Sequence, residues 1–526
     1  MASFPTRSYA DIRAALLDRR EVALLDVREE AVFAEAHPLF AANASLSRLE
    51  LDILARIPRL DTPITVYDDG EGLAARAAAK LKEFGYTDVA LLEGGLGGWR
   101  RDGGEIFQDV NAPSKAFGEL VESQRHTPSL SAEDVNALIE TEKNVVVLDA
   151  RRFDEYQTMS IPRGISVPGG ELVLRAGSIA PDPSTKVIVN CAGRTRSIIG
   201  TQSLINAGIG NQVWALRNGT IGWTLAGQVL DHGQSRRFPA IDEKHRLEVA
   251  NRARAVADRA GVRRLTSGAL QAWTAETRRT TYVFDVRTPE EYTASHLPGS
   301  RSVPGGQLVQ ETDHYATVRG ARIALVDDDG VRANMTSSWL AQMGWDVAVL
   351  DGVTRADFTA QGEWQPPRPP LPEVKTVDPA TLRNWLAAGD TLLFDVTTSA
   401  SHVAGHIPGA YFALRADLSV FVARSPAKRY VLTCGSSLLA TYAAGDLPAV
   451  TQQPVYVLEG GTAAWKAAGF PLEQGEQYLA SPRIDRYRRP YEGTDNPREA
   501  MQAYLDWEFG LVAQLERDGT HGFFVI

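Results

Sequence analysis

The chain repeats one order of short apolar segments four times, and this repetition restricts its fold more than any other feature. Each repeat opens with an apolar run that ends in an acid, at Asp26, Asp149, Asp285 and Asp395. A second apolar run follows (ITVYD, VIVNC, IALVD and YVLTC), and after it a segment with helical spacing of apolar residues. Such alternation is typical of βαβ units with a parallel sheet. Because neighbouring acids stand 110 to 136 residues apart, far more than the roughly 20–50 residues of a solenoid repeat, the sequence predicts four α/β domains.

Polar and proline-rich stretches separate the repeats and suggest where the domains end. The expected domains are 1–112, 125–235, 260–368 and 374–478, with linkers near 111–129, 232–262 and 364–375. The highly charged 232–262 segment predicts a solvated connecting helix. The remaining residues, 479–526, form a tail with an amphipathic helix at 497–517. We expect its Tyr504, Trp507, Leu511 and Leu515 to pack on a domain rather than bind a partner.

Composition and charge exclude several classes of protein. With 44% hydrophobic and 23% charged residues, the chain has the composition of a soluble globular protein, and it has no apolar run long enough to cross a membrane. Its N-terminal segment carries charges throughout and lacks the apolar core of a signal peptide, so we expect a cytoplasmic protein. A net charge of −10 argues against nucleic acid as a partner. An anionic substrate would therefore need a local cationic pocket.

The chain contains two cysteines, Cys191 and Cys434, which excludes a disulfide framework and an all-cysteine metal site. Seventeen residues before the glycine that ends the following helix (Gly85, Gly208 or Gly344) stand Asp68, Cys191 and Asp327. In the fourth repeat Cys434 follows the same strand. Both cysteines therefore occupy one position of the repeat, which favours a functional role for Cys191 over a buried structural one.

The loop after Cys191 reads Cys-Ala-Gly-Arg-Thr-Arg-Ser and suits an activated thiolate. It joins a strand to a helix, where unpaired backbone N–H groups and the positive end of the helix dipole stabilise an anion. Arg194 and Arg196 add cations that lower the pKa of a nearby thiol and bind oxyanions. The loop N–H groups, from Ala192, Gly193, Thr195 and Ser197, can cradle the same anion. The alternative is that both arginines are solvent-exposed surface residues.

The other three repeats have incomplete loops. The first has Asp68 and no arginine, and the third has Asp327 and keeps only Arg332. The fourth keeps the thiol of Cys434 but has no cation, and Thr397 stands where the other repeats have an arginine after the first strand. Because aspartate is a good capping residue at a helix N-terminus, we expect Asp68 and Asp327 to be structural replacements in inactive domains.

The repeats resemble rhodanese domains, the thiosulfate sulfurtransferase family. The resemblance covers about residues 5–475 and depends on the order of four motifs: an Asp-x-Arg strand end, a His-Ile/Leu-Pro-Gly turn, a strand-Cys-loop-helix and a Gly-Gly-x-x-x-Trp close. It implies four tandem rhodanese-like domains, each a parallel β-sheet flanked by helices, followed by the C-terminal helical tail. It further implies two pairs of domains, 1 with 2 and 3 with 4, with the cysteine in the second member of each.

The resemblance also implies ping-pong sulfur transfer without a cofactor or a metal. The Cys191 thiolate would attack the outer sulfur of thiosulfate, sulfite would leave, and a thiol or cyanide would take the sulfur from the resulting persulfide. Arg194 and Arg196 would bind the sulfonate oxygens. Asp149 and Arg151 would support the Cys191 loop.

Two other functions remain as alternatives. Dual-specificity phosphatases have a related fold with a Cys-x5-Arg loop, but that arginine would fall at position 197, which is Ser197; Arg196 fits the shorter Cys-x4-Arg loop that handles sulfur. Phosphatase and arsenate-reductase activity are therefore disfavoured. The second alternative is a protein-persulfide relay or scaffold that uses mercaptopyruvate or a carrier persulfide as donor. Cys434 stays open between a vestigial thiol and a second persulfide site.

The remaining motif residues are interpreted as structural. The acids that end the first strands should fix loops through hydrogen bonds. His296 and His406 belong to the turns, and Trp99, Trp223 and Trp465 should pack in the core.

Overall fold

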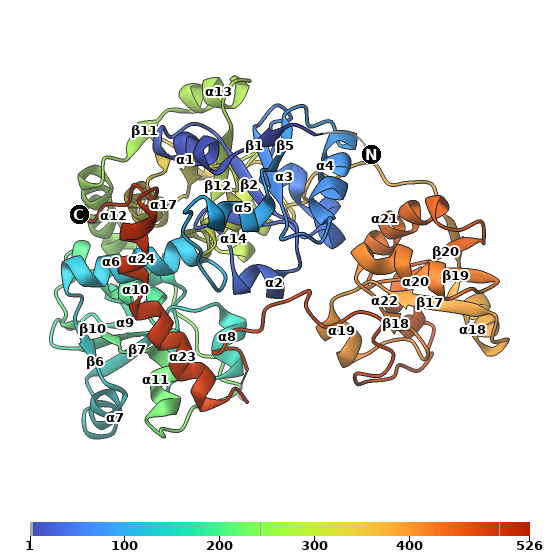
Figure 1. The fold of residues 1–526 in the computed structure, drawn as a ribbon. Helices are drawn as coiled ribbons and strands as arrows, with labels where there is room; N and C mark the ends of the chain where they lie inside the picture. Colours follow the sequence, from blue (N-terminus) through green and yellow to red (C-terminus); the bar gives the residue numbers. More distant parts are fainter. Residues whose placement is uncertain (1–3, 242, 494) are drawn as a thin grey trace.

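Each repeat forms one five-stranded parallel sheet flanked by helices, which confirms the predicted four-domain α/β fold (Figure 1). The computed structural model describes residues 4–241, 243–493 and 495–526. The strand order is β1-β5-β4-β2-β3 in the first sheet, and the other three sheets repeat it. Every pairing within the four sheets is parallel. The second apolar run of each repeat is therefore the central strand.

Domains 1 and 2 follow the same succession of elements. Domain 1 contains β1 (Thr6–Arg7), α1 (Tyr9–Leu17), β2 (Ala23–Asp26), α2 (Glu30–Glu35), β3 (Ala41–Asn43), η1 (Leu46–Leu51), α3 (Ile53–Arg56), β4 (Ile64–Tyr67), α4 (Leu73–Glu83), β5 (Val89–Leu92) and α5 (Gly95–Arg101). After the linking helix α6 (Ala112–Arg125), domain 2 contains β6 (Ser129–Leu130), α7 (Ala132–Thr141), β7 (Val145–Asp149), α8 (Phe153–Thr158), β8 (Ile165–Ser166), η2 (Gly169–Glu171), α9 (Leu172–Ile179), β9 (Lys186–Asn190), α10 (Thr195–Asn206), β10 (Val213–Leu216) and α11 (Gly219–Leu225).

Domains 3 and 4 repeat the pattern and are followed by the tail. After α12 (Glu243–Arg259), domain 3 contains β11 (Arg263–Leu265), α13 (Ser267–Ala275), β12 (Thr281–Asp285), α14 (Pro289–Ala294), β13 (Arg301–Ser302), α15 (Gly305–Gln310), α16 (Thr312–Tyr315), β14 (Arg322–Val326), α17 (Arg332–Gln342), β15 (Asp346–Leu350) and η3 (Arg355–Asp357). Domain 4 contains β16 (Lys375–Val377), α18 (Pro379–Ala387), β17 (Thr391–Asp395), α19 (Ser399–Ala404), β18 (Tyr411–Phe412), η4 (Arg415–Asp417), α20 (Leu418–Arg424), β19 (Arg429–Thr433), α21 (Leu438–Asp446), η5 (Leu447–Ala449), β20 (Val455–Leu458) and α22 (Gly461–Ala467). The tail contains α23 (Arg498–Phe509) and α24 (Leu511–Asp518).

Local sequence signals explain where these elements begin. The first helix of every domain starts after a side chain that caps it by accepting a backbone N–H, at Ser8, Ser131, Thr266 and Asp378. The central strands are apolar on both faces because helices cover both sides of a parallel sheet. The repeated fold thus follows from signals repeated in the sequence.

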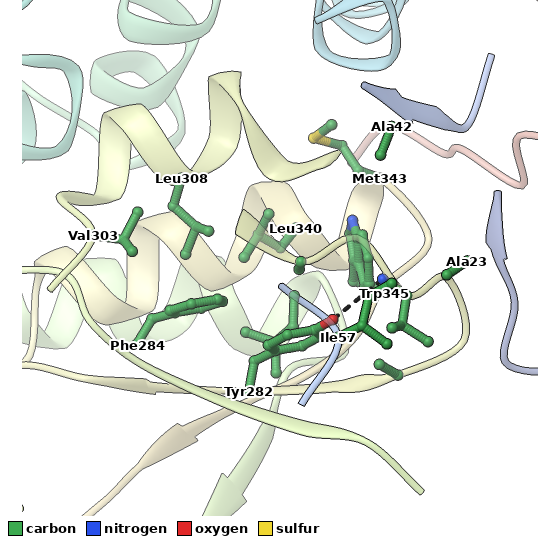
Figure 2. Close-up of a cluster of buried hydrophobic side chains, with 14 of the residues drawn as sticks. Ala23, Ala42, Ile57, Tyr282, Phe284, Val303, Leu308, Leu340, Met343 and Trp345 are labelled. Atoms are coloured by element: carbon green, nitrogen blue, oxygen red, sulfur yellow. Dashed lines mark hydrogen bonds between the residues drawn. The ribbon is translucent and has the colours of Figure 1, made fainter. Parts of the chain in front are cut away.

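Domain 3 shares a hydrophobic core with domain 1. Figure 2 shows Tyr282, Phe284 and Leu340 of domain 3 in one cluster with Ile57 of domain 1. The hydroxyl of Tyr282 donates a hydrogen bond of 2.6 Å to the carbonyl oxygen of Arg56 across the same interface. The two domains are therefore packed as one unit, although domain 2 separates them in the sequence.

The implied pairing of domains 1 with 2 and 3 with 4 does not describe the packing. Domain 3 packs on domain 1 through the shared core, and the backbones of Gly170 and Gly306 meet at its contact with domain 2. Domain 4 stands apart from the other three in Figure 1 and contacts domain 1, where Arg415 pairs with Glu50. Apolar surface on domain 3 is buried against domain 1, which is not its neighbour in sequence, and this decides the arrangement.

Two predicted linkers turn out to be packed helices. The 111–129 stretch forms α6, which is largely buried. Its Phe117 and Val121 join the core that domains 1 and 3 share. The 232–262 segment contains the expected helix, α12, but it is not simply solvated. Val249, Ala253 and Val256 bury one face of it in the core of domain 2. In both segments a narrow apolar stripe, hidden among many charges, is enough to dock the helix.

The C-terminal tail returns from domain 4 to the other three domains. In Figure 1, α23 lies across domain 2 and α24 lies beside α6. Tyr504, Leu511 and Leu515 are buried and Trp507 is partly buried, as predicted for packing on a domain. The single helix predicted over 497–517 is instead two helices, because α23 ends at Phe509 and α24 begins after Gly510.

Candidate active site at Cys191

Cys191 lies at the carboxyl end of β9, the central strand of domain 2, and α10 begins four residues later. Ligands of parallel α/β sheets bind at this edge. The side chain is buried, with 1% of the residue exposed. Its thiol donates a hydrogen bond of 3.4 Å to the Ser197 hydroxyl, which in turn donates to the carbonyl oxygen of Arg194 at 2.8 Å. The first turn of α10 thus contacts the sulfur directly.

The first turn of α11 holds the loop in place. The N–H groups of Thr220 and Ile221 donate to the carbonyl oxygens of Cys191 and Ala192, at 2.9 and 3.0 Å. Gly219 has a φ of +54°, and a Cβ there would overlap the Cys191 carbonyl oxygen. The repeated glycine turn therefore supports the cysteine loop, a role that sequence reasoning did not assign to it.

A buried ion pair supports the strand that carries Cys191. Arg151 donates to both oxygens of Asp149, at 2.9 and 2.7 Å, and Asn190 donates to the same carboxylate at 2.9 Å. Because Asn190 immediately precedes Cys191, this network sets where the strand ends. Sequence reasoning had missed Asn190, although its place next to the cysteine could have pointed to it.

The structural interpretation of the other motif residues agrees with the structure. Trp99, Trp223 and Trp465 are buried. His296 and His406 each contact a backbone carbonyl oxygen through Nδ1, at 2.9 and 2.8 Å.

Arg194 is turned towards α6. It donates to both oxygens of Glu119, at 2.7 and 2.8 Å, and also pairs with Glu122. Its guanidinium lies 4.3 Å from the ring centre of Phe509 in the tail. The alternative of a solvent-exposed Arg194 is therefore wrong, because the residue is buried. Its predicted role as a ligand of the substrate anion stays a prediction.

Arg196 points from the first turn of α10 towards α8, where it forms two hydrogen bonds with Glu155, of 2.8 and 2.9 Å. Burial raises the pKa of Glu155, but the charge and hydrogen bonds of Arg196 outweigh it and lower that pKa to about 2. The guanidinium is mostly buried and lies close enough to Cys191 to favour its thiolate. Arg196 is therefore the cation of the loop that acts on the sulfur.

The resting thiol differs from the expectation that Cys191 has a lowered pKa. Burial raises the pKa of Cys191, and the lowering by Arg196 and Ser197 does not offset it. The physical reason is that the tail covers the loop, while carboxylates neutralise both arginines. A change in these pairs that freed the positive charge of Arg196 would favour the thiolate.

The loops of domains 1 and 3 reveal what this loop geometry binds. The Asp68 carboxylate accepts the N–H groups of Gly70 and Ala74, at 3.1 and 2.9 Å. Asp327 accepts those of Gly330 and Ala333, at 3.1 and 2.8 Å. The aspartates are thus structural replacements, as expected. Their carboxyl groups stand at the position of the thiol, so the loop is a cradle of N–H donors in each of these two domains. Burial and the charge of Asp329 raise the pKa of Asp327, so the domain 3 cradle does not require a full negative charge.

The tail covers the Cys191 loop. Ala192 packs in one cluster with Tyr491, Met501, Tyr504 and Leu505. A Cβ on Gly193 would lie 3.1 Å from the ring of Tyr504 and 3.3 Å from Oε2 of Glu508. On the opposite side, Thr195 packs against Gly118 of α6. Sequence reasoning predicted that the helix packs on a domain, but no local motif linked it to Cys191.

A cavity of about 370 Å³ adjoins the site. Its lining includes five arginines, namely Arg151, Arg152, Arg196, Arg486 and Arg489, together with Tyr491 from the tail and Gln307 and Gln310 from domain 3. The acidic side chains Asp154, Glu155, Glu311 and Glu492 alternate with them. Several of these arginines are paired with acids, as in Arg196–Glu155, Arg152–Asp154 and Arg486–Glu492, so the lining carries little net charge.

Cys434 has a different environment. It is buried in an apolar cluster with Leu439 and Ala440. Asp395, the acid at the end of β17, contacts Nδ1 of His402 at 3.0 Å. Its counterpart in domain 2, Asp149, is paired with Arg151. The loop around Cys434 therefore lacks the ion-pair support found around Cys191.

Two absences concern only the residues that the structure describes. Among them, no group of three or more His, Cys, Asp or Glu side chains could hold a metal ion. None of their helices is long and apolar enough to cross a membrane.

A thiol cradled between the central strand of a parallel sheet and the following helix defines a class of α/β domains that work through a loop cysteine. The model of the Rhodanese-like domain matches residues 10–102, 131–226, 267–355 and 378–468. The chain belongs to this family and carries four tandem copies of its domain.

Similar proteins are known over the whole chain and over parts of it. A crystal structure of a thiosulfate sulfurtransferase from Pseudomonas aeruginosa is 69% identical, with a TM-score of 0.98, and the match covers 99% of this chain and 100% of that one. The "Putative thiosulfate sulfurtransferase SseB" of Mycobacterium tuberculosis is 29% identical over 150 residues, which is 26% of this chain and half the length of the relative. The "Uncharacterized protein YqhL" of Bacillus subtilis is 36% identical over 87 residues, or 16% of this chain and 65% of the relative.

Proposed function

We propose that this protein transfers sulfane sulfur from thiosulfate to a thiol, or to cyanide in an assay, through a persulfide on Cys191. The observation that carries the proposal is the cradle of N–H donors. In domains 1 and 3 the loop N–H groups donate to a carboxyl group, and in domain 2 a thiol stands at the same position. A persulfide on Cys191 would place a terminal anionic sulfur in this cradle. The likeness to the Pseudomonas aeruginosa thiosulfate sulfurtransferase supports the same activity.

The proposed reaction has two half-reactions. The Cys191 thiolate attacks the outer sulfur of thiosulfate, the S–S bond of the donor breaks, and sulfite leaves with the bonding electron pair. An acceptor thiolate or cyanide then attacks the outer sulfur of the persulfide and releases the Cys191 thiolate. Loop N–H groups and Arg196 stabilise the negative charge in both steps. No electron acceptor is needed, because only a sulfane sulfur changes partner.

The geometry of the loop gives less support to the alternative functions. A phosphatase would need an arginine at position 197, where the serine bonds to the thiol. The relay with mercaptopyruvate or a carrier persulfide as donor uses the same Cys191 and differs only in the donor.

Mass spectrometry of peptides from the thiosulfate-treated protein tests the proposal. After treatment with thiosulfate, the peptide that contains Cys191 should gain the mass of one sulfur atom and lose it again on addition of cyanide. The peptide with Cys434 serves as the internal control and decides whether that thiol is a second persulfide site. A Cys191 peptide that never gains sulfur contradicts the proposal and favours a scaffold.

Replacing Arg196 by alanine should raise the KM for thiosulfate about tenfold or more, since a charge-assisted hydrogen bond contributes about 1.5–3 kcal/mol. The change removes the cation nearest the sulfur and leaves Glu155 without its partner. Steady-state kinetics measure the effect. Arg217→Ala is the matched control, because Arg217 is an exposed arginine of the same domain that bonds Ser129. An unchanged KM in Arg196→Ala would mean that the pocket serves another donor.

A further inference from the structure

Glu508 is a fully buried acid that the proposed reaction does not yet use. It lies on α23 of the tail, and its Oε1 accepts a hydrogen bond of 2.9 Å from the Tyr504 hydroxyl. Its Oε2 has no hydrogen-bond partner among the described residues. This oxygen lies beside Gly193, in the middle of the Cys191 loop. A buried polar atom without a partner is rare and costly, so its position needs an explanation.

The charges around Glu508 leave it without a counter-ion of its own. Lys115 of α6 is close but bonds to Asp109 at 2.7 Å. Arg194 of the loop is also close but is held by Glu119 of α6. The nearby cations are thus each paired with another carboxylate.

The protonation state of Glu508 follows from this environment. Burial raises its pKa to about 8, and the charge of Glu119 acts in the same direction, whereas Lys115, Arg194 and the Tyr504 hydroxyl only partly offset them. At neutral pH the group is therefore a carboxylic acid. Because Oε1 already accepts a hydrogen bond, the proton belongs on Oε2, and the acid can donate from there.

We propose that Glu508 is an anion-binding residue of the Cys191 site, where it stays protonated and donates a hydrogen bond from Oε2 to the anion held in the loop. The anion is the sulfonate of the donor or the persulfide, so the inference rests on the proposed function for the identity of its ligand. Donation from a neutral acid adds affinity without adding a charge to a pocket that already holds several carboxylates. The C-terminal tail is then part of the site rather than only its cover.

The proposal predicts a specific dependence on pH. Below pH 8 the acid donates to the anion, and above it the carboxylate repels the anion. Anion affinity should therefore fall about tenfold for each pH unit above that value. Glutamine at position 508 also has a donor but cannot ionise, so it should keep the affinity and lose the alkaline decline. Alanine has neither property, so its affinity should be about tenfold below that of the glutamine variant and should not decline at alkaline pH.

The test measures binding of thiosulfate by calorimetry from pH 6 to 10. The full-length chain carries Cys191→Ser, so that neither turnover nor titration of the thiol contributes. Glu508→Gln and Glu508→Ala are compared with the parent, and Glu499→Gln, an exposed glutamate on the same helix, is the control. Thermal unfolding of each variant checks that α23 stays docked. Glu508→Gln is nearly isosteric, so it keeps the test valid if the alanine variant loosens the tail.

The outcomes separate the inference from the proposed function. An alkaline decline that is present in the parent and in Glu499→Gln but absent in Glu508→Gln and Glu508→Ala supports the inference, even if the wild-type chain fails to transfer sulfur. The inference is overturned if Glu508→Gln has the same pH profile as the parent. It is also overturned if Glu508→Ala binds thiosulfate as tightly as the parent below pH 8, or if the parent does not bind thiosulfate. Sulfur transfer by the wild-type chain together with a flat binding profile overturns the inference alone.

Discussion

Replacing Cys191 by serine should abolish thiosulfate:cyanide sulfurtransfer, with a loss on the order of a thousandfold or more. Serine keeps the size of the side chain and its contact with Ser197. It cannot carry a sulfane sulfur, so the loss reports the chemistry rather than the fold. The initial rate of thiocyanate formation measures the effect.

Cys434→Ser is the matched control for this experiment. It removes a buried thiol at the same position of the repeat, and we expect the overall rate to stay near that of the wild type. Full activity in Cys191→Ser would end the assignment of the nucleophile. Activity lost only in Cys434→Ser would transfer the role to domain 4.

Replacing Arg332 by methionine should destabilise the contact between domains 2 and 3 by about 3–5 kcal/mol, the usual cost of breaking a buried ion pair from one side. Arg332 occupies in domain 3 the place of Arg196 and is 1% exposed. It bonds to Asp329 at 2.7 Å, to Glu171 of domain 2 at 2.9 Å, and to Glu291 at 2.5 Å. Without it, these carboxylates lose their shared cation in a buried place.

Hydrogen exchange of the α17 amides measures this loss, because it reports local opening in a multidomain chain that has no single unfolding transition. Arg355→Met is the control. Arg355 approaches Asp328 at 3.7 Å, but its side chain is 84% exposed, and a surface pair of this kind contributes little. Equal protection of α17 in wild type and Arg332→Met would show that the cluster does not stabilise the interface.

The same cluster predicts an acid limit to stability. Burial raises the pKa of Glu291, but the hydrogen bond and charge of Arg332 outweigh it and lower that pKa to about 2. A lowered folded-state pKa means that the stabilisation is complete above the ordinary value near 4.5 and is lost as the pH falls towards 2. In Arg332→Met the protection of the α17 amides against exchange should therefore depend less on pH in this range. Hydrogen exchange after a jump to acid pH measures this protection.

The repeated features of the molecule could be predicted from the sequence because they depend on short-range patterns. Apolar runs alternate with helical segments in each repeat and predict four parallel sheets, which the structure confirms. The count from Gly208 back to Cys191 placed Asp68 and Asp327 in register with the thiol, and both carboxylates indeed accept the loop N–H groups. A helix that packs on a domain was likewise predicted from the spacing of Tyr504 and Leu511.

The surroundings of the candidate site could not be predicted in this way. Glu119 reaches Arg194 from a segment that resembled a polar linker, and its role depends on the apolar stripe that docks α6. The raised pKa of Cys191 depends on burial under a tail that begins almost three hundred residues later in the chain. Local spacing contains no information about which distant carboxylate meets a given arginine.

The sequence by itself determined the four domains, the position of Cys191 after a central strand and the length of its loop, since each is set by residues close together in the chain. Only the tertiary structure decided what surrounds Cys191. The docking of α6 and α23 buries the thiol, pairs Arg194 with Glu119, and brings Glu508 to Gly193. These contacts join elements whose apolar faces fit one another in space, and their energies depend on desolvation and on the partners that burial leaves to each charge.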